Sequence, residues 1–550
     1  MGKLKKIFYS FSLKERKLFW AGFLVATLSL VALGFIYADK ITKALPARGG
    51  NYTEGMVGQP TFINPILAVS EIDKSLVRLI FSRLEDLTPK MEIGEGGRVL
   101  KARLEGEVFW SDGEKLTSDD IIFTVQKIKD EEARSPLYED WRGISVKRIS
   151  ELEVEFELAG GPGFFGDRVK DLYILPRHIF EDVPPSNWRI SDFNLKPVGS
   201  GPFRFLDFSK KSNGFITEYK LEINPDYFKE KPLIEKINFA FFPTTEDLIS
   251  GFNSGAVDGA GGLTINEITG IRRPYEKLSF KLPNYYAIFM NQSRNPLLKE
   301  IGFRKVLAAT APRETIVQVA LGNLGSPEWG PIPLETETGD SSIKEGYIFT
   351  TSAGEVLDNL GWKFDETQTS LRKKMIGKTE TALELTLTVP DIDFLKTAGE
   401  ELKKEWEKLG MKLNIISVSQ EEIKEVIKNR DYELVLYGNV LNERLDLNSF
   451  WHSSQRFHPG LNLSMYSSKE ADKLIEKISE VVDVSKSKED FKALQKLITE
   501  DFPAVFLFSL DYVYVANTDL KGVDLNLISE PADRFNSIPK WYLKTVRVLK

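Results

Sequence analysis

Cysteine is absent from the 550-residue sequence, and histidine occurs only three times, at positions 178, 452 and 458. Without cysteine the chain cannot form disulfides, iron–sulfur clusters, zinc–thiolate sites or a thiol nucleophile. Three histidines scattered over so long a chain do not favour a histidine-rich metal site. We therefore expect neither a metal ion nor any other cofactor.

Low-complexity and disordered stretches are also lacking. Apolar residues make up 42% of the chain, charged residues make up 28%, and there are 40 glycines, as in an ordinary globular protein. This composition excludes a collagen-like or largely disordered chain. A length of 550 residues predicts three or four domains or sub-domains with a sizeable core.

A net positive charge is lacking beyond the first 48 residues. Those 48 residues contain nine Lys/Arg and two Asp/Glu, whereas the rest of the chain contains 64 basic and 78 acidic residues. A nucleic-acid partner requires clustered positive charge. The acidic body therefore excludes nucleic acid as the partner.

A single long apolar run, at 18–37, lies within the basic N-terminal region. Its twenty residues carry no charge, and as a helix they span about 30 Å, the thickness of a bilayer core. Six basic residues precede the run, so the positive-inside rule predicts a cytoplasmic tail at 1–17, a transmembrane anchor at 18–37 and an extracytoplasmic remainder that begins with a linker at 38–50. A cleaved signal peptide is the alternative, although its apolar region is ordinarily about 7–15 residues long.

The clearest secondary-structure pattern lies in the C-terminal half of the chain. Three strand-like segments alternate there with two helical patterns, and Ser419 with Glu422 has the spacing of a capping box at the start of the second helix. The strand-like segments are 383–389, 413–418 and 432–437. A β-α-β-α-β order predicts a parallel sheet, whose ligands bind beyond the carboxyl ends of the strands. We therefore expect a site at 438–451.

One stretch is distinctive enough to indicate a family. The sequence FWSDGEKLTSDDIIFTVQKI at 109–128 resembles a characteristic stretch of the extracellular solute-binding proteins of family 5, the oligopeptide- and dipeptide-binding proteins of ABC importers. Further family-like stretches follow in the family's order. They are ILPRHIF at 174–180, PVGSGPF at 197–203, NPDYF at 224–228, SGAVD at 254–258, FRKVLA at 303–308, GPIP at 330–333, GW at 361–362, FWHSSQ at 450–455 and DFP at 501–503.

The resemblance implies an α/β fold of the periplasmic-binding-protein type (class II), with two lobes that close on a ligand about a hinge and an extra inserted sub-domain. The transmembrane helix precedes this fold, and the resemblance implies the following division of the chain. Lobe I comprises 50–88, 193–283 and 508–550, the inserted sub-domain 89–192, and lobe II 284–507. The β-α-β-α-β unit predicted from the sequence pattern lies within lobe II.

The resemblance also implies where a ligand binds. In peptide-binding members an aspartate in the loop after the equivalent of Gly438 pairs with the ammonium group of the peptide. The loop is one residue longer here, so the counterpart of that aspartate is Asn442, Glu443 or Asp446. If Asn442 holds that place, the ammonium group has no charged partner, which argues against a peptide ligand. For Asp446 a solvated loop residue or helix cap is the alternative. We further expect four residues to line the cleft, with core packing as the alternative: Trp451, Asn462, Tyr285 and Asn284.

These features together predict a monomeric, non-enzymatic binding protein held at the outer face of the cytoplasmic membrane by its N-terminal helix. It would capture a peptide or a similar small solute by lobe closure and deliver it to ABC permease subunits. A membrane-anchored receptor or chaperone of the same fold, not coupled to transport, is the first alternative. A hydrolase is the second, since 78 acidic residues outside the N-terminal region allow many carboxylate pairs.

Overall fold

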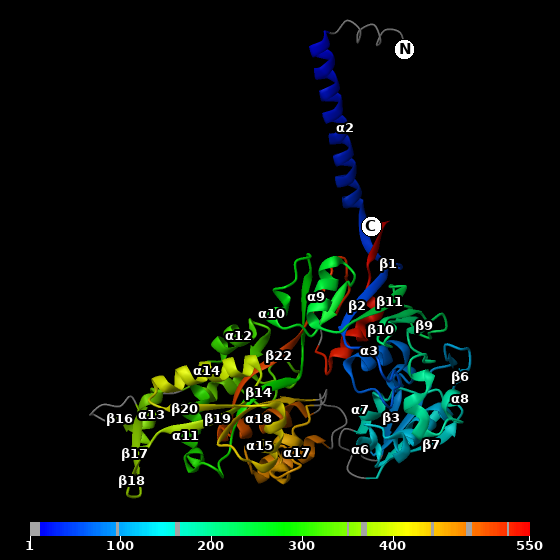
Figure 1. The fold of residues 1–550 in the computed structure, drawn as a ribbon. Helices are drawn as coiled ribbons and strands as arrows, with labels where there is room; N and C mark the ends of the chain where they lie inside the picture. Colours follow the sequence, from blue (N-terminus) through cyan, green and yellow to red (C-terminus); the bar gives the residue numbers. More distant parts are fainter. Residues whose placement is uncertain are drawn as a thin grey trace.

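The computed structural model describes residues 12–94, 98–159, 165–348, 351–364, 371–441, 445–479, 487–524 and 527–550. Its body consists of two α/β parts joined along one sheet (Figure 1). At one end lie β20 (Lys412–Val418), β19 (Glu384–Pro390), β21 (Leu434–Val440) and β14 (Asn284–Met290); next comes the crossing strand β22 (Ala504–Ala516); the other end has β12 (Gly259–Gly261), β2 (Asn51–Val57), β11 (Lys236–Phe242), β10 (Ile216–Ile223) and β9 (Phe203–Lys210). β13 (Glu276–Lys281) and β15 (Gly325–Pro327) also pair with β22.

Lobe I is built on the sheet from β12 to β9. Strand β2 lies between β11 and β12 and is parallel to both. Helices cover this sheet, and their apolar faces pack into its buried core. They are α3 (Glu71–Ile80), α4 (Leu84–Leu87), α9 (Thr245–Ser254), α10 (Ile265–Ile268) and the C-terminal 3-10 helix η9 (Pro531–Lys540).

The segment that the resemblance assigns to an inserted sub-domain packs on lobe I through a continuous hydrophobic core. Its sheet has the order β3 (Met91–Gly94), β4 (Val99–Arg103), β8 (Glu153–Leu158) and β7 (Ile144–Ser150). Beside this sheet are the short ladder β5 (Val108–Phe109) with β6 (Lys115–Leu116) and the helices α5 (Ser118–Ile128), η2 (Glu131–Ala133), α6 (Tyr138–Trp141), α7 (Phe165–Lys170), α8 (Arg177–Phe180), η3 (Pro185–Ile190) and η4 (Asp192–Asn194). The family-like stretch at 109–128 forms a turn followed by helix α5. A capping box between Thr117 and Asp120 lies at the start of this helix.

Lobe II contains the β-α-β-α-β unit that the sequence predicts. Along the chain, β19 is followed by α14 (Asp393–Lys408), β20, α15 (Gln420–Asn429) and β21. Strand β19 is parallel to both β20 and β21. Ser419 and Glu422 form the capping box at the start of α15. Around this unit lie η5 (Pro296–Lys299), α11 (Ile301–Ala309), α12 (Arg313–Leu321), η6 (Ser341–Tyr347), α13 (Ala353–Asn359), α16 (Asn448–Trp451), η7 (Ser453–Gln455), α17 (Lys469–Ser479), α18 (Lys488–Asp501) and the small sheet β16 (Lys363–Phe364), β17 (Arg372–Ile376), β18 (Thr379–Ala382).

Strand β22 connects the two lobes. Its first residues pair with β14 of lobe II, and its residues from Asp511 onward pair with β13 of lobe I. Between these ladders Asn284 bonds both backbone groups of Leu510: its Nδ2 donates to the carbonyl oxygen (3.1 Å), and its Oδ1 accepts from the N–H (2.8 Å). Asn284 therefore fixes β14 to β22 at the point where the chain passes from one lobe to the other.

The N-terminal helix α2 (Leu13–Ile41) is longer than the predicted anchor and projects from lobe I (Figure 1). It is the helix within the described residues that is long and apolar enough to cross a membrane. The region predicted to be a linker is more ordered than expected: the helix continues to Ile41, and β1 (Thr42–Ala47) follows it directly. β1 is a strand because the C-terminal strand β23 (Lys544–Leu549) supplies an antiparallel partner.

Candidate functional site

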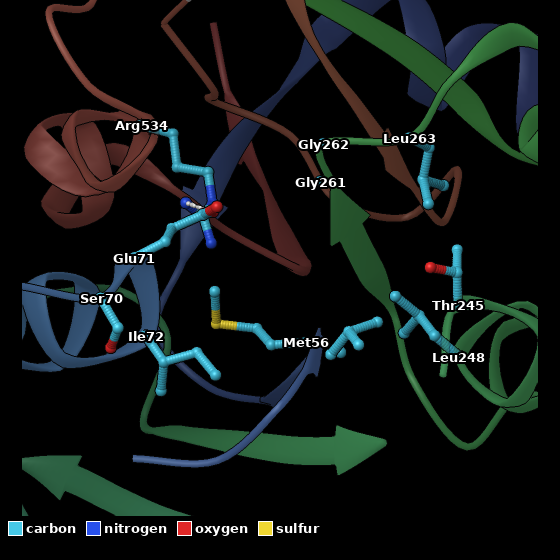
Figure 2. Close-up of a pocket in the computed structure, with 12 residues that line it drawn as sticks. Met56, Ser70, Glu71, Ile72, Thr245, Leu248, Gly261, Gly262, Leu263 and Arg534 are labelled. Atoms are coloured by element: carbon cyan, nitrogen blue, oxygen red, sulfur yellow. Dashed lines mark hydrogen bonds and ion pairs between the residues drawn. The ribbon is translucent and has the colours of Figure 1, made fainter. Parts of the chain in front are cut away.

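Lobe I has a pocket where two parallel strands end (Figure 2). The pocket measures about 270 Å³ and lies beyond the ends of β2 and β12, beside the first residues of α3 and α9. Its lining consists of Gly55, Met56, Val57, Ser70, Glu71, Ile72, Thr245, Leu248, Gly261, Gly262, Leu263 and Arg534. The carboxyl edge of a parallel sheet is the usual place for a ligand site in α/β proteins. This edge is therefore the candidate site in lobe I.

A buried ionic network forms the polar end of the pocket. Arg534 Nη2 lies 2.8 Å from Glu54 Oε1, and its Nη1 lies 3.1 Å from Glu71 Oε1. Two tyrosines complete the network: Tyr514 donates its hydroxyl to Glu54, and Tyr512 donates to Glu71 Oε1 (2.8 Å). Arg534 and Glu54 are fully buried, so their charges depend on these contacts in place of water.

The pKa values of the network follow from burial and from mutual charge. Burial raises the pKa of Glu54, although the Arg534 guanidinium opposes the shift. Burial alone would lower the pKa of Arg534, but the nearby tyrosines and carboxylates raise it above its usual value. Arg534 is therefore a permanent buried cation beside two carboxyl groups.

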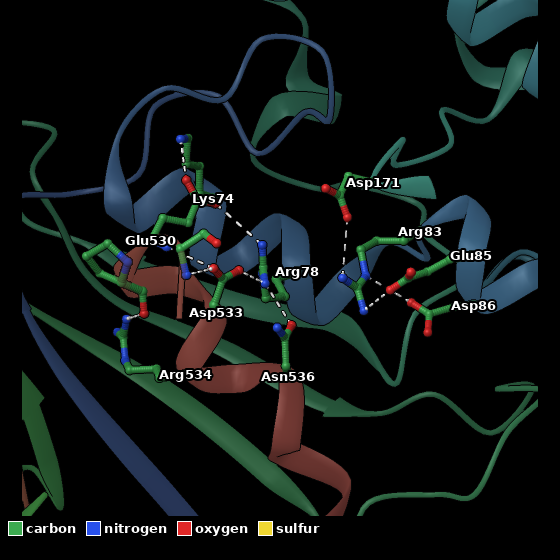
Figure 3. Close-up of polar contacts among 12 residues, drawn as sticks. Lys74, Arg78, Arg83, Glu85, Asp86, Asp171, Glu530, Asp533, Arg534 and Asn536 are labelled. Atoms are coloured by element: carbon green, nitrogen blue, oxygen red, sulfur yellow. Dashed lines mark hydrogen bonds and ion pairs between the residues drawn. The ribbon is translucent and has the colours of Figure 1, made fainter. Parts of the chain in front are cut away.

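Helix η9 is attached to α3 by further ion pairs (Figure 3). Arg78 pairs with Asp533, and Lys74 Nζ lies 2.5 Å from Glu530 Oε2. Because Arg534 belongs to the same 3-10 helix, these contacts hold the C-terminal segment along α3, from Lys74 to Arg78 in its last turn. They thereby position Arg534 and Glu71 at the pocket.

In lobe II, Tyr285 is the centre of a buried cluster next to the end of β21. Its hydroxyl accepts hydrogen bonds from Trp451 Nε1 (3.0 Å) and Asn439 Nδ2 (3.1 Å). Burial raises the pKa of Tyr285 well above its usual value. Both Tyr285 and Trp451 are fully buried in this structure, so they support the end of β21 from the protein interior.

Two asparagines from the predicted site use their amides on the backbone. Asn462 is fully buried; its Oδ1 accepts from the N–H of Tyr466 (2.9 Å), and its Nδ2 donates to the carbonyl oxygens of His452 and Tyr466. Asn462 thus fixes the loop that precedes α17. Asn284 is occupied in the same way by Leu510 of the crossing strand.

Asp446 is half-buried in the loop after β21. Its Oδ1 accepts a hydrogen bond from the N–H of Asn448 (2.9 Å), the first residue of α16. Burial raises the pKa of Asp446, and the charges of Arg168 and Asp140 act on it in opposite directions. Both of these residues belong to the inserted sub-domain, so this loop of lobe II lies within electrostatic range of it. Asn442 and Glu443 lie outside the described residues.

No group of three His, Asp or Glu side chains with the arrangement of a metal site occurs among the described residues. His452 has other contacts: its Nδ1 lies 2.8 Å from Ser454 Oγ, and its Nε2 lies 3.5 Å from Glu476 Oε1.

Sequence reasoning missed the lobe I pocket and the network around Arg534. The available signals were Gly55 within the segment 51–57 and the pair Gly261 and Gly262, because glycine in a strand often marks a close approach of a ligand or of another backbone. Nothing local in the sequence joins Glu54 to Arg534, which lie 480 positions apart.

The two lobes, the strand that passes through both and the strand ends that each presents define a solute-binding protein of the two-lobed α/β type. Residues 63–457 match the family model of the bacterial extracellular solute-binding proteins, family 5 (middle region). The chain belongs to this family, which confirms the identification made from its motifs.

Curated proteins and solved structures agree with this assignment. The chain is 26% identical over 525 residues to the oligopeptide-binding protein AppA of Bacillus subtilis, an alignment that covers 90% of this chain and 92% of AppA. The structure of that AppA in complex with a nonapeptide is similar over 91% of this chain and all of AppA, with a TM-score of 0.62 and 23% identity. The unliganded open form of the murein tripeptide-binding protein MppA matches with a TM-score of 0.75 at 16% identity, over 92% of this chain and 99% of MppA.

Proposed function

We propose that this protein is the extracytoplasmic substrate-binding component of an ABC importer, that it binds peptides between lobe I and lobe II, and that it performs no chemistry on them. The observation that carries the proposal is the single strand β22, which pairs with both lobes and leaves a candidate site on each side of it. The peptide as ligand class rests on the similarity to AppA, which is named as an oligopeptide-binding protein. Lobe I is assigned to 50–88, 193–283 and 508–550, the inserted sub-domain to 89–192, and lobe II to 284–507.

The structure is assigned to the open state. Its TM-score is higher with the unliganded open form of MppA than with AppA in complex with a nonapeptide, although AppA is more similar in sequence. A change in the relative placement of two lobes lowers a TM-score without altering the fold of either lobe. A ligand that contacts both lobes would stabilise the closed state over this one.

Asp446 is proposed to hold the ammonium group of the peptide, with Glu443 and Asn442 as the alternatives in the same loop. Its position supports this role: the loop directly follows β21 and lies within electrostatic range of the inserted sub-domain. Four residues are proposed to support the site from the protein interior, by holding the strand ends and the hinge in place: Tyr285, Trp451, Asn462 and Asn284. A hydrogen bond from any of these four to the ligand would require a change in their present hydrogen bonds.

Peptide capture is tested by native mass spectrometry of the full chain released from detergent. We expect a set of co-purified peptide masses that denaturation and refolding remove and that a peptide mixture restores. A single non-peptide mass, or an empty protein that no peptide mixture stabilises against heat, would contradict peptide binding.

The ammonium site is tested by titrating the full chain with one peptide in two forms, with a free and with an acetylated N-terminus. We expect Asp446→Asn to weaken binding of the free form by about ten- to hundredfold, because a hydrogen-bonded charge pair is lost, and to leave the acetylated form unchanged. Asp207→Asn, on an exposed position of β9, is the matched control. If the loss follows Glu443→Gln or Asn442→Ala instead, the assignment moves to that residue; if none of the three variants changes the ratio, the ammonium binds elsewhere.

The helix α2 is proposed to be an uncleaved anchor, so that the main domain lies outside the cytoplasmic membrane of the cell. Its length and apolar, exposed surface support this assignment. A cleaved signal peptide is the alternative, and an intact mass of the membrane-extracted protein that begins after residue 37 would establish it.

The direct connection from α2 to β1 favours a second candidate function, that of an anchored receptor not coupled to an importer. With no unstructured residue between helix and strand, lobe I is tied closely to its own anchor. Uptake of a labelled peptide by cells with and without the gene separates the two: importer function predicts lost uptake, and receptor function predicts unchanged uptake.

A further inference from the structure

A two-stranded ribbon connects the membrane helix to the body. It consists of β1 and β23, which pair antiparallel from Thr42 opposite Leu549 to Ala47 opposite Lys544 and form a sheet of their own. The N–H of Lys550 also donates to the carbonyl oxygen of Ile41, the last residue of α2 (2.9 Å). The C-terminus of the chain is therefore fixed at the end of the membrane helix, as Figure 1 shows.

The ribbon concentrates positive charge on an otherwise acidic molecule. Residues 40–48 contain three basic and no acidic residues, and residues 540–550 contain four basic and no acidic residues. Between them, residues 49–539 contain 60 basic and 78 acidic residues. Strand pairing thus brings two basic segments together from opposite ends of the exported chain.

The ribbon also exposes apolar side chains on both faces. Leu45 lies opposite Val546 on one face, and Leu549 lies opposite Thr42 on the other. Val546 is 49% exposed and Leu549 is 74% exposed. Basic and apolar side chains on one exposed element are the combination that binds at a charged lipid surface. An isolated two-stranded ribbon is only marginally stable in water, so a surface that covers it would stabilise it.

The position of the ribbon specifies which surface that is. The uncharged run ends at Tyr37, and Ile41 lies four helical residues further on, about 6 Å along the helix axis. The headgroup region of a bilayer extends about 5–7 Å beyond the hydrocarbon core. β1 therefore begins at headgroup depth if α2 crosses the membrane.

We propose that the ribbon formed by β1 and β23 binds anionic phospholipid headgroups and thereby holds lobe I at the membrane surface. This proposal rests on the transmembrane anchor put forward above. Lys43 and Lys544 supply charge on the face of the ribbon from which Val546 enters the interface, and Arg547 adds charge on the opposite face. The body, which is acidic, would otherwise be repelled by an anionic surface.

The absence of cysteine makes a site-specific test direct. The full chain with Val546→Cys, labelled with an environment-sensitive fluorophore, is reconstituted into vesicles of phosphatidylcholine alone or with phosphatidylglycerol. A nitroxide on the lipid headgroups quenches a label that lies among them. We expect at least threefold stronger quenching in the anionic vesicles, reduced by high salt. A label at Thr379→Cys, in exposed β18 of lobe II, should be quenched equally weakly in both.

Charge variants separate lipid binding from other causes. The triple variant Lys43→Gln, Lys544→Gln, Arg547→Gln should lose the difference between the two vesicle types. A matched triple variant, Lys378→Gln, Lys424→Gln, Lys428→Gln, makes the same change in net charge on exposed positions of lobe II and should retain it. An unchanged melting temperature of the labelled protein verifies that the ribbon variant is folded.

Three results would overturn the proposal. The first is equal quenching in both vesicle types, and the second is a difference that the ribbon variant retains; either means that something other than lipid, such as a permease, covers the ribbon. The third is release of the protein from the vesicles by alkaline carbonate. That result would remove the anchor itself, and so it distinguishes failure of the proposed membrane attachment from failure of the ribbon.

Discussion

At the scale of single residues, the buried charges of lobe I hold distant parts of the chain together. Arg534 of the C-terminal segment meets Glu54 of the first strand of the body, and both are fully buried. The sequence could not predict this pair, because burial of a charge depends on a partner that is distant in the chain. Asn284 is similar: its place near the crossing was predictable, but its two bonds to Leu510 were not.

Removal of one partner of the buried pair should be far more costly than removal of both. We expect Arg534→Met to lower the free energy of unfolding by about 3–5 kcal/mol, because Glu54 is left buried without a cation. The double variant Glu54→Gln, Arg534→Met should regain most of this loss. Urea denaturation of the full chain in detergent measures both, and a double variant as unstable as the single one would contradict the account.

Glu328 should make stability depend on pH. It is fully buried beside the crossing strand, accepts hydrogen bonds from Ser509 Oγ (2.8 Å) and the N–H of Leu334 (3.1 Å), and burial raises its pKa to about 8. The folded chain therefore retains a proton that the unfolded chain releases above its ordinary pKa of 4.5. Stability contributed by this group is present at low pH and is lost as pH rises toward 8, by about 1.4 kcal/mol per pH unit.

The variant Glu328→Gln has a side chain of nearly the same shape that can still accept hydrogen bonds, but it has no group that titrates. We expect its unfolding free energy to change less between pH 6 and pH 8 than that of the unmodified protein, and to exceed it at pH 8. Denaturation curves at pH 6, 7 and 8 measure the slope. Parallel slopes for the two proteins would show that Glu328 does not titrate in this range.

At the scale of elements, local patterns predicted what is local. Strands β19, β20 and β21 and the helices between them follow the predicted order because each is specified by its own periodicity and capping residues. The region 38–50 differs from the linker expected there because the partner strand of β1 is at the opposite end of the chain. The site expected after β21 in lobe II was predicted from this local order of strands and helices. The lobe I pocket could not be predicted in this way, because it depends on β2 and β12, which lie about 200 residues apart.

Asn284 should control local opening of the crossing strand β22. We expect Asn284→Ala to speed hydrogen exchange at the amide of Leu510 and to cost about 1–3 kcal/mol, since two buried backbone groups lose their partner. Asn462→Ala is a matched control, because its amide also bonds buried backbone but in the loop before α17. Unchanged exchange at 508–512 in Asn284→Ala would mean that β15 and β14 hold the crossing without it.

At the scale of the whole molecule, the family assignment accounts for the two-lobed architecture, and the motifs at 109–128 and 450–455 made that assignment possible from the sequence. The motifs carry no information on how far apart the lobes stand, because lobe separation depends on the ligand and on the hinge. They are equally silent on the ligand itself, since the loop expected to bind its ammonium group departs from the family pattern.

The central claim is that peptide binding closes the two lobes, and a distance measured across them tests it most directly. The chain has no cysteine, so Glu139→Cys in α6 and Lys473→Cys in α17 can carry a donor and an acceptor dye on the full chain. The two helices belong to different parts of the body, α6 to the inserted sub-domain and α17 to lobe II (Figure 1). We predict that peptides shorten the distance between the dyes over the same concentration range in which they bind. Peptide binding with an unchanged distance would contradict the account.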